Sequence, residues 1–217
     1  LPNDLVSYMY EITELNRDRN VKIIEQINVL NSLLKQNGVS PIFLKGSSYL
    51  IQGLYDDIAE RMIGDIDFLV SKNEYDLASI ILSDHNYKPV SQLGYHFPQF
   101  KHYPRLFNND LIAAVEIHKE MVNKKYVKEF NFDKIKGEIT HENGYSFLGN
   151  NDQKALSIFS NQINDDGFKL KKVNLKNAYD FLLLNNIKPG TDFAFRYNKL
   201  KTPIMCFLAS TDYLFGD

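Results

Sequence analysis

The chain has 217 residues, of which 44% are hydrophobic and 24% charged, an ordinary composition for a globular protein with a sizeable core. Its 25 basic and 27 acidic residues nearly balance, which excludes binding of nucleic acid by bulk positive charge. The single cysteine, Cys206, excludes an internal disulfide and favours a reducing, cytoplasmic compartment. Because Cys206 lies in the apolar run 204–208, we predict a buried thiol. No apolar stretch reaches the length of a membrane span.

The first half of the chain alternates between predicted helices and strands. A helix that ends at Asn37-Gly38 is predicted by apolar residues at helical spacing, namely Val21, Ile24, Ile27, Leu30 and Leu34. Residues 41–44 predict a short buried strand, followed by a turn at 45–48 and a helix over 49–54. A second buried strand is predicted over 64–70, and an amphipathic helix over 72–86.

The second half of the chain becomes helical after a few more strands. Residues 95–107 are rich in aromatic side chains and irregular, residues 111–118 predict a strand, and residues 138–148 predict another. Helices are predicted over 151–163, 172–186 and 203–215. This order predicts an α+β fold: a mixed β-sheet flanked by helices in residues 1–149, with an N-terminal helical segment over 1–38, followed by a small helical bundle in residues 150–217.

Three acidic residues stand in the two predicted central strands. Asp65 and Asp67 are one residue apart in a strand that continues as Phe68-Leu69-Val70, so both side chains project from the same face. Their mutual repulsion makes a divalent cation the expected partner, because Mg²⁺ prefers carboxylate oxygens. Glu116 lies in the second apolar strand, where an unpaired charge is costly. We therefore expect Glu116 at the same cation site.

The segment Lys45-Gly46-Ser47-Ser48 joins a predicted strand to a predicted helix. Glycine lets the backbone approach a ligand closely, and the N–H groups at a helix N-terminus suit phosphate. Ser47 adds a hydroxyl donor. An ordinary strand-to-helix turn uses the same residue types, so this segment is informative only together with the acids. Lys45 has two open interpretations, a contact with phosphate or an ion pair with a neighbouring aspartate.

Together these segments resemble the polymerase-β-like nucleotidyltransferase superfamily. More narrowly, residues 44–46, 61–70 and 115–118 resemble its branch of uncharacterised nucleotidyltransferases, and the resemblance covers residues 40–120. It implies transfer of a nucleoside monophosphate, AMP being favoured, from an NTP, ATP being favoured. The acceptor is a hydroxyl or another nucleophile, and pyrophosphate leaves. The implied mechanism is an in-line displacement with two Mg²⁺ ions, for which Mn²⁺ can substitute.

The resemblance also implies a role for each residue of the site. Asp65 and Asp67 bind both metals, and Glu116 completes the site of the metal that activates the acceptor. Glu116 is also placed to take the proton of the acceptor. In this chain the third acid is glutamate rather than the commoner aspartate. Contacts to the NTP are expected from Lys45, Gly46, Ser47, Arg61 and Gly64. Contacts to the acceptor are expected from His102, Arg105 and His118. His118 can instead contact Glu116.

Two other functions fit parts of the sequence. The first is a catalytically inactive nucleotidyltransferase fold that only binds a ligand or a partner, although the presence of all three acids argues against such decay. The second is a transferase that extends an RNA end, which ranks lower because the sequence has no basic stripe or stacking platform. We expect a small molecule or a protein as the acceptor rather than nucleic acid, and no membrane partner.

Overall fold

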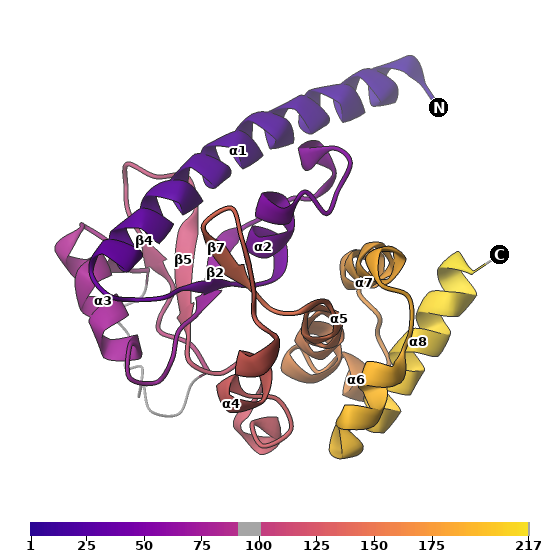
Figure 1. Cartoon of the computed structure of the whole chain (residues 1–217). Helices are drawn as coiled ribbons and strands as arrows, with labels where there is room; N and C mark the ends of the chain where they lie inside the picture. Colours follow the sequence, from indigo (N-terminus) through magenta and orange to yellow (C-terminus); the bar gives the residue numbers. More distant parts are fainter. Residues whose placement is uncertain (91–100, 217) are drawn as a thin grey trace. The chain divides into compact units, whose positions relative to one another are not determined.

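The computed structural model describes residues 1–90 and 101–216, which belong to two compact units (Figure 1). The first unit comprises Leu1–Tyr95 and Tyr103–His118, and the second comprises His96–His102 and Lys119–Asp217. Of the residues predicted to form the site, all except His102 belong to the first unit. The predicted aromatic segment 95–100 lies outside the described residues.

A mixed β-sheet forms the centre of the first unit. Its strands lie in the order β3 (Lys88–Pro89), β4 (Leu106–Phe107), β5 (Ala114–His118), β2 (Asp65–Leu69) and β1 (Ile42–Phe43). The central strands β2 and β5 pair in parallel, whereas the other neighbours pair antiparallel. Both central strands are buried through apolar residues such as Ile66, Phe68, Val115 and Ile117, which have no exposed surface. The predicted α+β fold with a mixed sheet is confirmed.

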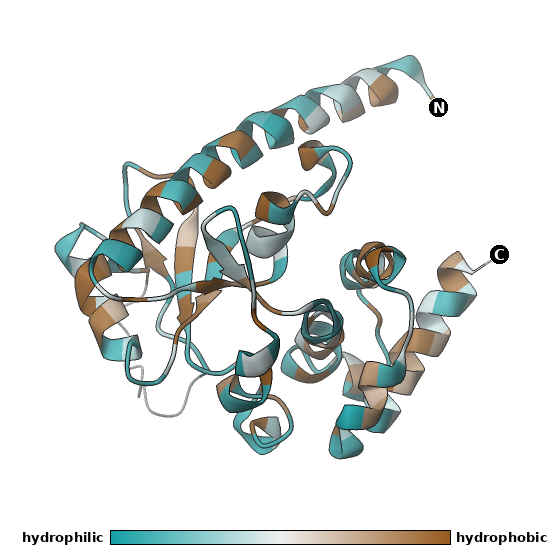
Figure 2. Cartoon of the chain, viewed as in Figure 1, coloured by the Kyte–Doolittle hydropathy of each residue, from teal (hydrophilic) through white to brown (hydrophobic). Residues whose placement is uncertain are grey.

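The long helix α1 (Asn3–Gln36) packs its C-terminal half into the core of the first unit. Ile23, Ile27, Leu30 and Leu34 are at most 1% exposed. Of the five apolar residues whose spacing predicts this helix, Ile27, Leu30 and Leu34 are buried, whereas Val21 is exposed and Ile24 is half-buried, because the buried face runs through Ile23 instead. Figure 2 shows hydrophilic and hydrophobic residues alternating along this helix. The helix ends at Gln36, and Gly38 follows with φ 78°, a left-handed conformation that favours glycine.

Polar side chains of α1 also bind the segments that lead into the two central strands. Asn20 donates to the carbonyl of Arg61 at 2.8 Å, and Arg19 donates to the carbonyl of Ile63 at 3.1 Å, just before β2. Gln26 exchanges two hydrogen bonds with the backbone of Ala113, just before β5. One helix therefore fixes the start of both strands that carry the acids.

Helix α2 (Lys45–Gln52) begins at Lys45, although we predicted a turn over 45–48 and a helix from Tyr49. Lys45 itself has φ 50°, a left-handed conformation that costs a non-glycine residue on the order of 1 kcal/mol. At Gly46, a Cβ atom would lie 3.1 Å from the side chain of Ile63, so the absence of a side chain allows the helix to pack closely. Helix α3 (Tyr75–Asp84) completes the first unit, together with the 3-10 turn η1 (Ile58–Glu60).

The second unit is mostly helical. Its helices are α4 (Phe132–Ile135), α5 (Asn150–Phe159), a π-helix (Ser160–Asn164), α6 (Gly167–Leu170), α7 (Leu175–Ile187) and α8 (Lys201–Phe215). Short 3-10 turns are η3 (Lys124–Tyr126), η4 (Lys136–Glu138), η6 (Asp192–Arg196) and η7 (Asn198–Leu200). Phe130, Phe159 and Tyr197 form an aromatic core with ring centroids 5.1 to 5.8 Å apart. None of the described helices is long and apolar enough to cross a bilayer.

The structure differs from two sequence predictions and leaves a third open. The single strand predicted over 138–148 is a hairpin, β6 (Thr140–Glu142) and β7 (Tyr145–Phe147), because Asn143-Gly144 takes positive φ angles at both positions. The prediction of a buried Cys206 thiol was wrong: α8 turns Ile204 and Phe207 into the core and leaves Cys206 exposed. The division into domains after residue 149 stays a prediction, and the two compact units divide the chain after His118.

Candidate functional site

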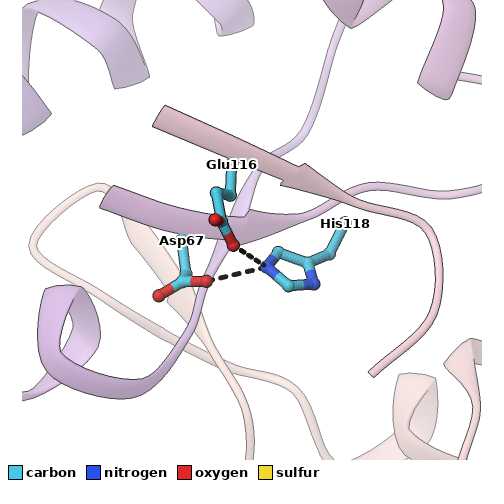
Figure 3. A group of neighbouring side chains, drawn as sticks. All are labelled: Asp67, Glu116 and His118. Carbon is cyan, nitrogen blue, oxygen red and sulfur yellow. Dashed lines mark hydrogen bonds and ion pairs between the residues drawn. The ribbon is translucent and has the colours of Figure 1, made fainter. Parts of the chain in front are cut away.

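Asp67 and Glu116 lie side by side on the two central strands. In the parallel pairing of β2 and β5, Asp67 is the register partner of Glu116, and Leu69 that of His118. Since side chains alternate along a strand, Glu116 and His118 project from the same face of β5. The His118 Nε2 atom lies 2.7 Å from an oxygen of Asp67 and 3.5 Å from an oxygen of Glu116 (Figure 3). The fold thus brings two carboxylates and an imidazole to one point.

The arrangement of these three side chains fits a divalent cation. Asp67, Glu116 and His118 each offer one ligand atom, and these atoms all lie within 4.8 Å of one another. Carboxylate oxygens and a neutral imidazole nitrogen are ordinary ligands of such ions. Asp65 lies on the same face of β2 as Asp67 but outside this group of three. The predicted metal role of Asp65 stays a prediction.

Lys45 forms an ion pair with Asp67. The Lys45 Nζ atom lies 2.8 Å from Asp67 Oδ1, the same oxygen that contacts His118. The segment after β1 is placed by a backbone hydrogen bond of 3.0 Å from the N–H of Leu44 to the carbonyl of Asp67. In this structure Lys45 therefore forms the ion pair with an aspartate, the second of its two predicted interpretations.

The electrostatics of this pair oppose the effect of burial. Burial alone would raise the pKa of Asp67, but the charge of Lys45 and the hydrogen bond with His118 hold that pKa below its usual range. Burial would likewise lower the pKa of Lys45, yet the negative charges of Asp67, Glu116 and Asp65 raise it. Both groups are therefore held in their charged forms.

Asp65 has a different cationic partner. Arg105 donates from Nη2 to Asp65 Oδ2 at 3.0 Å, with the two side chains 44% and 29% exposed. Burial raises the pKa of Asp65, and repulsion from Asp67 and Glu116 adds to the rise, while Arg105 and Lys45 oppose it. Arg105, which we predicted to contact the acceptor, thus lies against a carboxylate of the site in this structure.

Ser47 is fully buried and ties α2 to β2. Its hydroxyl accepts a hydrogen bond of 3.0 Å from the backbone N–H of Asp67. This contact fixes the position of Asp67 and directs the Ser47 hydroxyl toward the strand. A role of Gly46 and Ser47 in binding phosphate then depends on the backbone N–H groups of the first turn of α2, which a helix does not satisfy internally.

The other predicted NTP contacts are less closely tied to the acids. Arg61 is 7% exposed and donates to the carbonyl of Met62 at 2.7 Å, so it supports the segment before β2. Gly64 is exposed, and a Cβ atom there would only reach ordinary contact with Arg105. His102, predicted to contact the acceptor, belongs to the second unit. The roles of all three remain predictions.

Two features of the site were not predicted from the sequence. Lys45 and His118 were expected at the site, but not that both contact the same oxygen of Asp67, because this depends on which distant segments pair in the fold. Asn20 and Gln26 of α1 were not expected to support the site. Their signal was present in the sequence: polar residues recur among the apolar residues of one helix face, where they are buried only if they find partners.

The family described as "Uncharacterised nucleotidyltransferase" matches residues 1–194. This range is most of the 217-residue chain, so the chain belongs to that family. Membership defines the class of chemistry as that of a transferase that uses an NTP. No curated protein and no solved structure matches the chain.

Proposed function

We propose that the first unit is a metal-dependent nucleotidyltransferase that moves a nucleoside monophosphate, with AMP favoured, from an NTP to an acceptor nucleophile. The observation that carries this proposal is the convergence of Asp67, Glu116 and His118 from adjacent parallel strands in a chain of this family. The acceptor is a small molecule or a protein hydroxyl.

The residues of the chain divide the work of the reaction. Asp67 and Glu116 would hold Mg²⁺ or Mn²⁺, and Asp65 would contribute to a second ion. Bound metal supplies charge neutralisation and a more acidic nucleophile. Glu116 takes the proton of the acceptor hydroxyl, and His118 holds Asp67 in position. The first N–H groups of α2, at Gly46 and Ser47, bind the phosphates that leave as pyrophosphate.

A second candidate function is an inactive fold that only binds a ligand. The observation in its favour is that Asp65 and Asp67 have cationic partners from the chain itself, Arg105 and Lys45. A site that is neutralised by its own chain could have lost its chemistry. Turnover distinguishes the two functions, whereas binding of ATP does not.

The test is transfer of label from α-³²P-ATP in the presence of Mg²⁺, to added small-molecule acceptors and to proteins of a cell extract. We expect transfer by the parent protein and its loss in Asp67→Asn. The matched control is Asp84→Asn, which removes one exposed carboxylate from the same unit. Circular dichroism would check that each variant is folded. Equal transfer by the parent and Asp67→Asn would refute the proposal.

A further inference from the structure

Two basic side chains occupy the carboxylates at which divalent cations are expected. We infer that Lys45 and Arg105 act as counter-ions supplied by the chain itself. When metal and NTP bind, the two basic side chains move away from Asp67 and Asp65 and contact the triphosphate, so the binding of metal and the binding of NTP are strongly coupled. This inference rests on the proposed function. It adds a dependence between the two ligands of the site: neither metal nor NTP binds well without the other.

The charges of the site explain why counter-ions are needed. Asp65, Asp67 and Glu116 are neighbours, and repulsion from Asp67 and Glu116 acts on Asp65. Lys45 and Arg105 reach two of the three carboxylates at 2.8 and 3.0 Å. Without them, the metal-free protein would hold three adjacent negative charges in a partly buried place. The two basic residues therefore stabilise the site in the form described.

Lys45 is placed where it can contact either Asp67 or a bound triphosphate. It is the first residue of α2, so its ammonium group is attached at the helix end whose N–H groups suit phosphate. Its four-carbon stem is flexible, and rotation of the side chain alone can move the ammonium group away from Asp67. The left-handed φ of 50° at Lys45 is unusual for a residue with a side chain. Such backbone strain is found most often at functional sites.

Arg105 is the weaker of the two counter-ions. Its side chain is 44% exposed, and its partner Asp65 is 29% exposed, whereas the Lys45 and Asp67 side chains are 26% and 7% exposed. An exposed ion pair is screened by water and is easily exchanged. A guanidinium group also matches phosphate in a bidentate geometry. We therefore expect most of the coupling to come from Lys45.

The exchange keeps every charge paired only when both ligands are present. A metal ion alone has to compete with Lys45 for Asp67, and the released ammonium group then has no anion. A triphosphate alone is repelled by the three carboxylates of the site, Asp65, Asp67 and Glu116. With both, the carboxylates bind metal and the basic side chains bind phosphate. By linkage, each ligand raises the affinity of the other by the same factor.

The experiment is a titration of the full chain with Mn²⁺, followed by electron paramagnetic resonance, with and without a non-hydrolysable ATP analogue. For the parent we expect the analogue to tighten Mn²⁺ binding about tenfold or more. For Lys45→Met we expect tighter Mn²⁺ binding without the analogue and a much smaller effect of adding it. The matched control is Lys22→Met, which removes an exposed lysine of α1 in the same unit and should behave as the parent does.

A second variant, Lys45→Gly, tests the same inference if Lys45→Met does not fold. Lys45→Gly removes the ammonium group and suits the left-handed backbone, so it should fold and show the same change in coupling. Weaker Mn²⁺ binding by either variant without the analogue, or unchanged coupling, would overturn the inference. If the parent shows coupling but no transfer of label, the inference stands and the proposed catalysis fails. If label is transferred but the variants keep full coupling, only the inference fails.

Discussion

Asp152 offers a test of how burial controls stability in the second unit. Its side chain lies in α5, is 3% exposed and accepts a hydrogen bond of 3.2 Å from the hydroxyl of Tyr197. Burial, with added repulsion from Glu138, raises the pKa of Asp152 from 3.8 to about 6, against the opposing effects of Tyr197 and Arg196. The folded protein therefore keeps a proton on Asp152 at pH values where the unfolded chain has lost it.

The sign and size of the effect follow from this difference. Between pH 4 and 6 the folded state binds more protons, so the free energy of unfolding falls as pH rises and levels off above the folded pKa. A shift of about two pKa units, at about 1.4 kcal/mol for each unit, amounts to a loss of about 3 kcal/mol at neutral pH. An asparagine side chain at this position would be neutral at every pH and could still accept from Tyr197.

We therefore expect Asp152→Asn to raise the free energy of unfolding by up to about 3 kcal/mol at pH 7.5 and to have little effect at pH 4. Urea denaturation followed by circular dichroism at the two pH values measures this difference. Asp165→Asn, which removes an exposed carboxylate from the same unit, is the control. A variant that is equally stabilised, or destabilised, at both pH values would refute the argument from burial.

Three further predictions concern stability. Because the pKa of Asp67 is lowered, its ionised form contributes stability above the unfolded pKa that is lost as pH falls through the folded value, so Asp67→Asn should destabilise the first unit at pH 7 and less at pH 3 in thermal denaturation. Lys154 is fully buried and donates to the carbonyls of Lys188 and Gly190 at 2.7 and 2.9 Å. Lys154→Met should therefore lower the free energy of unfolding in urea by about 1–3 kcal/mol and speed hydrogen exchange around residue 190. An unchanged exchange rate would contradict this role of Lys154. Gly144 has φ 80° in the hairpin turn, so Gly144→Ala should cost about 1 kcal/mol in the same assay, whereas no loss would mean that the turn relaxes freely.

The strands that carry the acids could be predicted from the sequence because their signals are local. Apolar residues around Asp65, Asp67 and Glu116 indicate buried strands, and alternation places the two aspartates on one face. The parallel pairing that sets Asp67 beside Glu116 could not be predicted in this way. It depends on contacts between segments about fifty residues apart, which no local pattern encodes.

The start of α2 shows a second limit of the sequence. Gly46 and Ser47 are typical of a turn, but the helix begins at Lys45, four residues before the predicted start at Tyr49. Packing of Gly46 against Ile63 and the buried hydrogen bond of Ser47 outweigh the local preference of these residues. The prediction for Cys206 failed for a related reason, since an apolar run in a helix does not say which of its sides faces the core.

The hydrogen bonds from α1 to the segments before β2 and β5 have a practical consequence for the choice of a fragment to assay. Arg19, Asn20 and Gln26 take no part in the chemistry, yet they set where both acid-bearing strands begin. A gene shortened to residues 40–120 would encode Asp65, Asp67 and Glu116 but not α1, the helix that aligns their strands. Screens of such fragments for activity should therefore retain α1 from Asn16 onward.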